Sequence, residues 1–157
     1  MPNWFFLIVN FLYQVGLALW IGGTVALGAA VAPVLFRSLP RHEAGALFGP
    51  SLRRFARVRI WAVVLVIAGA TIRYLAWETH GMTAWIVIRW LAIAFLAFSI
   101  VYEVTTLEPA MESRRRELLP SLPDTDPRRQ EFQRLHHRAE LLMRMGLIAA
   151  LVALFFS

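Results

Sequence analysis

The segment 132–157 constrains the fold of this chain most, because it is apolar enough to cross a membrane and yet carries charges. A helix needs about 20 residues to cross the hydrocarbon core of a bilayer. Counting about 20 residues back from Ser157 places the opposite membrane surface near Arg138, so Glu140 and Arg144 fall inside the apolar layer. Each charge there costs roughly 2.5 to 3.5 kcal/mol on insertion scales. We therefore expect the other helices to pack around these two side chains and shelter them.

The spacing of His136, Glu140 and Arg144 predicts one polar stripe, because residues four apart share a helix face. Three interpretations of the stripe stay open. Glu140 and Arg144 pair along their own helix and lock the bundle. Alternatively, the stripe belongs to a path for protons or a substrate, because such paths use intramembrane carboxylates beside histidine. In the third interpretation, the stripe is a polar face that binds a partner protein.

The composition places the chain in the membrane class. Hydrophobic residues make up 59% of its 157 residues and the mean hydropathy is +0.59, which is too apolar for a soluble domain of this size. The net charge of +6 comes from arginines beside the hydrophobic segments, as the positive-inside rule predicts, so we expect a lipid bilayer and no nucleic acid as partner. The absence of cysteine excludes disulfides, thiolate metal sites and cysteine nucleophiles.

The hydrophobic segments predict an all-α fold, with residues 1–157 forming a single domain built as an up-and-down, four-helix transmembrane bundle. The predicted spans cover residues 4–36, 55–77, 84–106 and 132–157. Between the first two spans, the stretch 40–55 mixes apolar residues with arginine and predicts a short amphipathic segment in the headgroup layer. Arginines are concentrated after spans 1 and 3, whereas the connection 78–83 has none. We therefore expect both termini on the outer, periplasmic side of a bacterial inner membrane.

The first span carries a small-residue pattern and a few polar exceptions. Tyr13 and Gln14 should hydrogen-bond to another helix, because polar side chains facing lipid are costly. Pro33 is expected to mark the end of the span. The small residues recur at spacings that allow helices to approach closely, and they are Gly16, Gly22, Gly23, Ala26 and Ala30.

The remaining charges within the predicted spans sort by depth. Arg73 and Arg89 lie near the outer surface, whereas Glu103 lies toward the cytoplasm with His136. Arg73 either reaches the interface with its long side chain or pairs with a carboxylate.

Three stretches of the chain, LALWIGGTVALGAAVAPVLFRSLPRHEAGALFG, LEPAMESRRRE and FQRLHHRAELL, resemble in order and spacing a family of small membrane proteins. This family includes transmembrane protein 205 and a bacterial four-span domain of unknown function. The resemblance implies an integral membrane protein and names no substrate. More distantly, the Trp-x-Gly-Gly stretch is similar to the copper-resistance membrane proteins and the membrane protoporphyrinogen oxidases. Those families place a histidine in the first span, where this chain offers Tyr13 and Gln14.

No enzyme motif such as HExxH, GxSxG or a P-loop occurs, so we expect no catalysis. Haem would need two histidines on facing helices at one depth. His80 lies about 30 Å from His136 and His137, which leaves His42 as the only histidine that could meet His136, so neither haem nor a metal is predicted. We expect a structural or accessory subunit of a membrane assembly, or a homo-oligomer. The alternatives are a small transporter or channel-like protein that uses the stripe and, third, a haem-binding redox protein.

Overall fold

The computed structural model describes residues 3–79, 81, 83–117 and 126–157, and these ranges contain helices and no strand. The first half of the chain forms α1 (Asn3–Val25), the π-helical segment η1 (Ala26–Val31), α2 (Ala32–Ser38) and α3 (Arg41–Trp77). The second half forms α4 (Ala84–Tyr102), the π-helical segment η2 (Glu103–Leu107), α5 (Glu108–Glu117) and α6 (Pro127–Phe155). The expected all-α class is confirmed for this part of the chain.

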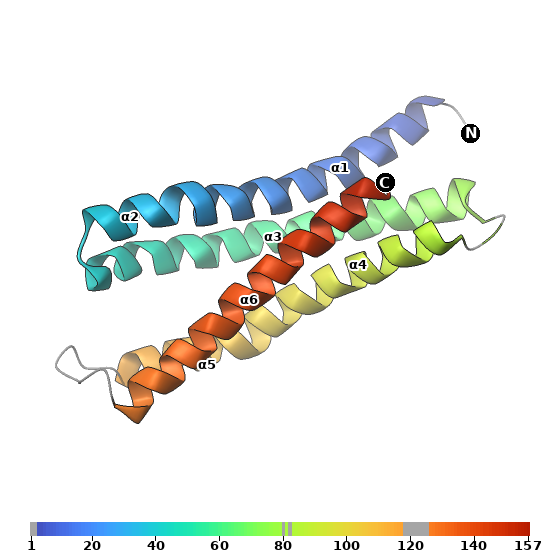
Figure 1. Ribbon diagram of the computed structural model, residues 1–157. Helices are drawn as coiled ribbons and strands as arrows, with labels where there is room; N and C mark the ends of the chain where they lie inside the picture. The colour runs from blue at the N-terminus through green and yellow to red at the C-terminus, as the bar shows by residue number, and fades with distance from the viewer. Residues whose placement is uncertain (1–2, 80, 82, 118–125) are drawn as a thin grey trace.

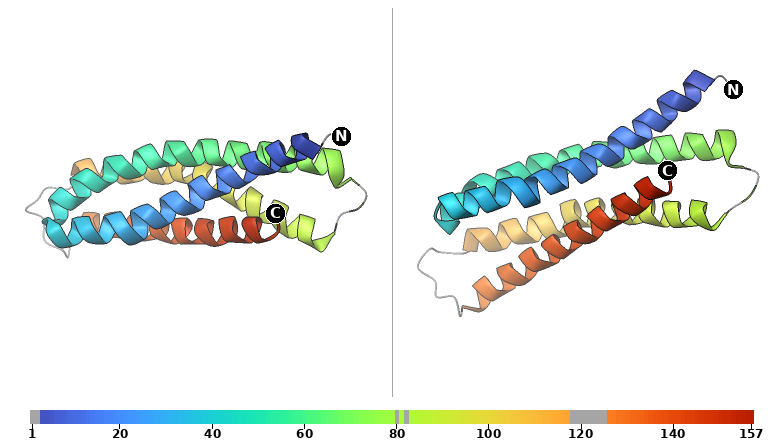
Figure 2. Two further views of the ribbon diagram at one scale, coloured as in Figure 1. Left: turned by 90° about the horizontal axis from the view of Figure 1, so that it is seen from above. Right: turned by 45° about the horizontal axis from the view of Figure 1, so that its top comes forward.

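The two halves fold as two long helical hairpins that lie against each other (Figures 1 and 2). In the first hairpin, α1, η1 and α2 form one rod and α3 returns beside it. In the second, α4, η2 and α5 form a rod and α6 returns beside it. The hairpins meet where α1 contacts α6 and where α3 contacts α4. Side chains from α1, α3, α4 and α6 are buried between the two hairpins, and they include Tyr13, Leu17, Val66, Leu96 and Ala150.

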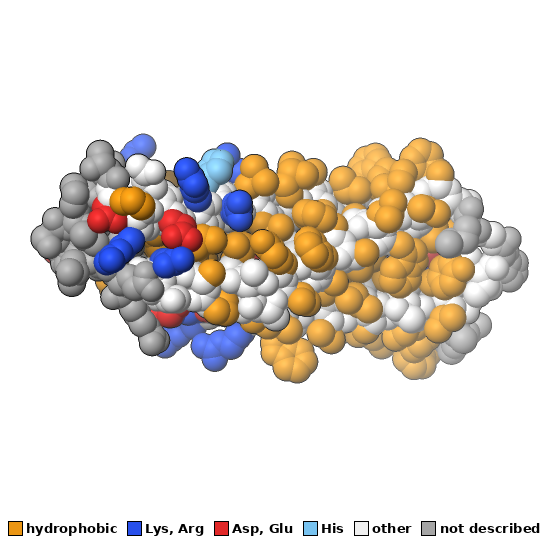
Figure 3. All heavy atoms as spheres, turned by 90° about the horizontal axis from the view of Figure 1, so that it is seen from below, with side chains coloured by type: hydrophobic (Ala, Val, Ile, Leu, Met, Phe, Trp, Pro, Cys, Tyr) orange, Lys and Arg blue, Asp and Glu red, His pale blue; other side chains and the backbone are white. Residues whose placement is uncertain are grey.

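Three helical stretches of the described chain are long and apolar enough to cross a membrane, namely Asn3–Ser38, Glu43–Trp77 and Ala84–Arg115. α6 is not one of them, and it carries Arg138, Glu140 and Arg144 at the start of its apolar part. Figure 3 shows charged side chains gathered at one end of the molecule, while hydrophobic side chains dominate the rest of that face. The chain is therefore a helical membrane protein, and a fourth crossing by α6 stays a prediction.

Each long rod contains a π-helical segment that ends two residues before a proline. η1 precedes Pro33 and η2 precedes Pro109. Proline lacks an N–H and its ring clashes with the carbonyl of residue i−4, so a regular α-helix cannot run through it unchanged. The wider π turn accommodates the ring, and the hydroxyl of Thr105 donates to the carbonyl of Val101 at 2.7 Å. The first rod consequently continues to Ser38 instead of ending at Pro33 as the sequence predicts.

The amphipathic stretch predicted at 40–55 is not a separate segment. It is the first part of α3, which runs without interruption from Arg41 to Trp77. Two of its apolar side chains pack inside the molecule, since Ala44 is buried and the Phe48 ring lies 6.0 Å from the Phe36 ring of α2, whereas Leu47 is exposed. At about 1.5 Å per residue, α3 is long enough to project well beyond the hydrocarbon core.

Close approach of α1 to α3 occurs at Gly16 and Gly23. A Cβ atom on Gly16 would lie 2.7 Å from the carbonyl oxygen of Ala62, and one on Gly23 would collide with the Phe55 ring. These two glycines are seven residues apart and share one face, whereas Gly22 lies to the side of it. η1 also begins at the next small residue, so four-residue spacing no longer describes one face beyond it. Three members of the predicted packing face are exposed instead, and they are Gly22, Ala26 and Ala30.

Candidate functional site

A partly buried ion cluster joins α3 to α4 beside their short connection. Glu78 directly follows α3, and its carboxylate accepts a hydrogen bond from Arg89 Nη1 at 3.0 Å and a second from Arg89 Nη2. Arg73 Nε lies 2.8 Å from the same carboxylate. The side chain of Arg89 is 2% exposed, so its charge depends on this partner. The structure therefore places Arg73 in an ion pair, the second of the two alternatives that the sequence leaves open.

The two guanidinium groups set the ionisation of Glu78. Burial raises the pKa of this carboxyl, but the hydrogen bonds and positive charge of Arg89, followed by the charge of Arg73, outweigh burial. The pKa therefore lies below its ordinary value, and the carboxylate stays ionised. Two arginines share one carboxylate, so the cluster retains one net positive charge.

The polar residues of α1 have different environments. The hydroxyl of Tyr13 donates to the carbonyl of Ala153 in α6 at 2.8 Å, and the side chain is buried. This bond is of the kind the sequence predicts, and it fixes α1 against the last turns of α6. Gln14 is exposed instead, because Tyr13 and Leu17 occupy the buried face of α1.

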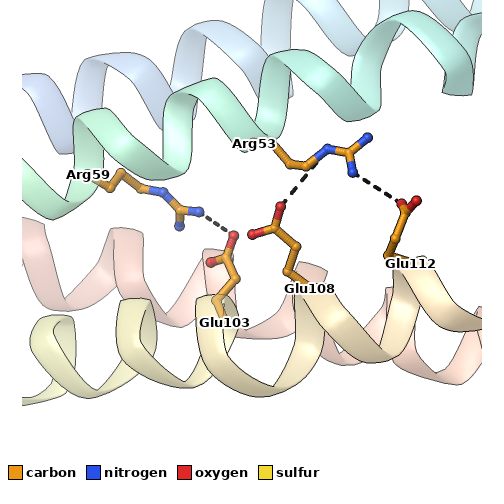
Figure 4. A network of polar contacts seen from close by, with 5 residues as sticks. All are labelled: Arg53, Arg59, Glu103, Glu108 and Glu112. Atoms are coloured by element: carbon orange, nitrogen blue, oxygen red, sulfur yellow. Dashed lines mark hydrogen bonds and ion pairs between the residues drawn. The ribbon is translucent and has the colours of Figure 1, made fainter.

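A second buried arginine lies toward the charged end of the bundle. Arg59 of α3 is 1% exposed and forms an ion pair with Glu103 at the start of η2 (Figure 4). Its guanidinium carbon lies 5.3 Å from the Trp20 ring centroid and 5.2 Å from that of Phe55. A desolvated cation over an aromatic face gains about 2 kcal/mol or more. The aromatic rings and the carboxylate together stabilise a full charge in the interior.

The ion pairs between α3 and α5 continue outward from Arg59. Arg53 lies one to two turns earlier on α3, with Nη1 3.1 Å from the carboxylate of Glu112 and Nε 4.0 Å from that of Glu108 (Figure 4). The Arg53 side chain is 43% exposed, so solvent screens these contacts. Of the ion pairs drawn in Figure 4, the Arg59–Glu103 pair therefore contributes most to the stability of the fold.

Several buried donors have no hydrogen-bond partner among the described residues. They are the indole N–H of Trp20, the hydroxyl of Thr24, and the Nε–H groups of Arg59 and Arg89. A buried donor without a partner costs about 1–3 kcal/mol. Trp20 and Thr24 lie one turn apart on α1, and Trp20 contacts Arg59, so three of these donors gather at one level of the bundle.

The His136, Glu140 and Arg144 stripe faces outward, which corrects the expectation that other helices pack around it. Arg144 Nη2 lies 2.5 Å from the Glu140 carboxylate, and the two side chains are 73% and 46% exposed. The pairing along one helix is thus present, but no helix in the described part of the chain encloses it. His136 is exposed too, and its ring stacks on Phe132 at 6.5 Å.

The reason lies on the opposite face of α6. Gly146, Ala150 and Ala153 are the buried residues of this helix. At about 100° per residue, Gly146 points some 200° away from Arg144, so one face cannot hold both sets. Small residues let backbones approach closely, and a Cβ on Gly146 would lie 3.3 Å from the Trp20 ring. Packing thus turns the charges outward.

The structure describes only some of the histidines that were considered as ligands of haem or a metal. His137 is exposed on α6, while His80 and the side chain of His42 lie outside the described parts of the structure. Among the described residues, no group of three or more His, Asp or Glu side chains is arranged to hold a metal.

Sequence reasoning missed Arg59 and Glu78 as interior ionic residues. Arg59 falls within the predicted span 55–77, but it ends a dense run of arginines that the sequence interpretation counts on the cytoplasmic flank. The available signal was the uncharged stretch from Ile60 to Ile72 that follows it directly, which places Arg59 at the start of the apolar part of that helix. Glu78 is the only acid in its connection, directly after a span with an interior arginine, and this neighbourhood could have suggested the pair.

Long apolar helices, charges gathered at one end and buried interhelical ion pairs define a helical integral membrane protein. Residues 15–118 match the family described as a domain of unknown function, DUF4149, and the chain belongs to that family. The matched region runs from α1 to the end of α5. Comparisons with curated proteins and with solved structures find no match.

Proposed function

We propose that this protein is a four-span component of a bacterial inner membrane that acts without catalysis, as a structural or accessory subunit of a larger assembly or as a homo-oligomer. The observation that carries the proposal is the pairing of the interior arginines. Arg59, Arg73 and Arg89 each contact a carboxylate contributed by another helix or by the connection that follows α3.

Buried pairs of this kind are suited to holding helices in place. Separating one partner from a buried ion pair costs about 3–5 kcal/mol, because a charge is left without compensation. A transport cycle that moves α3 relative to its partner helices would have to break and remake such pairs at each turnover. A static role demands only that they persist, which favours the structural interpretation.

The surface supports a membrane location for the whole body of the protein. Large hydrophobic side chains are exposed on every long helix, including Phe11, Trp61, Leu91 and Ile148. We infer that lipid or other membrane subunits cover them. The arginine-rich end corresponds to the cytoplasmic side under the positive-inside rule, which puts both termini outside when α6 crosses.

Native mass spectrometry of the full chain, released from membranes in mild detergent, tests the proposal. We expect the protein in a complex with other membrane subunits or with copies of itself. Because the natural sequence has no cysteine, single cysteines placed beside either terminus report sidedness by labelling in intact cells. A protein that is monomeric and without partners under all gentle extraction conditions would contradict the proposal.

A small transporter is the second candidate, and the unpartnered donors of Trp20, Thr24 and Arg59 favour it. Buried donors in a membrane interior are typical of sites that meet a water molecule or a polar solute. Proton flux into liposomes, followed with a pH-sensitive dye, separates the candidates. Flux that is lost in a Thr24→Val variant and retained in Thr105→Val would favour transport, because the Thr105 hydroxyl is exposed and already bonded within its helix.

A further inference from the structure

We propose that the outward face of α6 is a self-association surface, on which Arg144 of one copy pairs with Glu140 of a second copy. This inference rests on the proposed function and names the occupant of the face. It follows from the charge, exposure and spacing of the residues on that face.

The face has the spacing of a helix–helix seam. Its members are separated alternately by three and four residues, and their exposures are 57% for Leu141, 73% for Arg144, 54% for Ile148, 48% for Leu151 and 82% for Phe155. An alternating three-and-four spacing keeps one stripe of a helix facing a partner helix along its whole length. This seam, from Leu141 to Phe155, extends over the apolar half of α6 and is distinct from the polar stripe of His136, Glu140 and Arg144, with which it shares Arg144.

Lipid alone is a poor covering for this seam. The outward faces of α3 and α4 carry exposed apolar side chains such as Trp61, Leu91 and Phe98, which a covering of lipid alone would suit. On α6 the corresponding surface carries an ion pair, and charges in the hydrocarbon layer are costly unless they face protein or water. A covering helix that brings charges of its own removes that cost.

A second copy supplies those charges in the right order. In a twofold dimer the same patch faces itself, so a contact of residue 140 with residue 144 occurs twice. Side chains on a helix lean toward its N-terminus, so the Arg144 guanidinium reaches the level of Glu140, as it does on its own helix at 2.5 Å. When the twofold axis runs along the membrane normal, the two α6 helices are parallel. Glu140 of each copy then lies beside Arg144 of the other copy. The four charges then alternate in sign.

Cysteine cross-linking of the full chain in liposomes tests the seam with the native charges intact. Ile148 lies at the centre of the seam, so Ile148→Cys is the test variant. Leu91→Cys is a matched control, because Leu91 lies on the outward face of α4 with 65% exposure. A disulfide requires Cα atoms within about 7 Å, which a seam near the twofold axis provides. We expect a several-fold larger cross-linked dimer fraction for Ile148→Cys. Equal fractions for the two variants would overturn the proposal.

Charge exchange tests the pairing itself. Arg144→Glu places like charges on the seam, so we expect loss of the dimer in native mass spectrometry, and the double variant Glu140→Arg/Arg144→Glu should restore it. Dimers that survive the single reversal would overturn the assignment of these residues. Monomers that retain anionic phospholipid, lost in Arg144→Gln, would show that lipid headgroups cover the face.

The outcomes also separate this inference from the proposed function. A chain that is monomeric by itself but co-purifies with different membrane subunits leaves the proposed function standing and refutes self-association. A chain that is monomeric with no partner refutes both.

Discussion

Replacing Glu103 by glutamine should destabilise the protein strongly, because it leaves the Arg59 charge without a partner. Arg59 is 1% exposed, and Glu103 is its ion-pair partner. Removing one member of a buried pair costs about 3–5 kcal/mol. Glutamine keeps one acceptor oxygen and the Trp20 and Phe55 rings stay in place, so we expect the lower end of that range, about 3 kcal/mol. That is a change of about 100-fold in the unfolding equilibrium.

Unfolding of the full chain in detergent micelles, followed by tryptophan fluorescence and circular dichroism, measures the effect. The matched control is Glu131→Gln, because Glu131 forms its 3.0 Å pair with Arg114 at 51% exposure. Exposed pairs contribute about 0–1 kcal/mol, so the control should unfold almost as the native protein does.

A second substitution checks the cause. In the Glu103→Gln background, Arg59→Met removes the orphaned charge and fills similar space, so most of the lost stability should return. If Glu103→Gln unfolds like the native protein, or if Arg59→Met makes the variant still less stable, the argument from a buried charge is refuted.

Three further changes probe helix contacts, an interhelical hydrogen bond and acid sensitivity. Gly16→Ala should cost about 1–3 kcal/mol of unfolding free energy, because the new methyl meets backbone across the α1–α3 contact. Gly22→Ala should be neutral or stabilising by up to about 1 kcal/mol, since nothing lies within 4 Å, and equal losses for the two would contradict the packing assignment. Tyr13→Phe should cost about 1 kcal/mol by removing the hydroxyl that donates to Ala153, and an unchanged midpoint would refute that contribution. The pKa of Glu78 lies below its ordinary value, so its ion pairs stabilise the fold fully above that ordinary value and their contribution falls as pH drops through the folded pKa. Melting temperatures measured from pH 7 down to pH 3 should show this loss in the native protein and a weaker one in Glu78→Gln, and parallel curves would argue against it.

The helical class and the apolar stretches could be predicted from sequence because they depend on local composition. A long apolar run must satisfy its backbone internally, and a helix does so whatever surrounds it. The Arg73 ion pair was left as one of two alternatives, because a lone arginine near a span end either reaches the interface or pairs with a carboxylate, and the sequence did not identify Glu78 as its partner. The π-helical segments could not be predicted, because proline usually ends a helix, whereas a local widening of the helix accommodates Pro33 here.

The orientation of α6 could not be predicted because its sequence holds two competing faces. Glu140 and Arg144 form one four-residue pattern, and Gly146 and Ala150 form another on the opposite side. The cost of exposing charge to lipid favours burying Glu140 and Arg144, but the close contacts of α6 with α1 and α4 require the small residues on its other face. Arg59 was missed because five other arginines precede it between residues 37 and 57, and only the uncharged stretch that follows it distinguishes the one that turns inward.

The division of α6 into a small buried face and a charged outer face bears on how the protein enters the bilayer. The three apolar stretches are the kind that a translocon releases into lipid unaided, whereas each charge at the centre of a helix adds about 2.5 to 3.5 kcal/mol to the cost of insertion. Gly146, Ala150 and Ala153 contribute little hydrophobicity of their own. Insertion of α6 should therefore follow assembly of the preceding helices, whose grooves receive its small face, and bulky substitutions at Ala150 should leave the C-terminal segment uninserted while the earlier helices integrate normally.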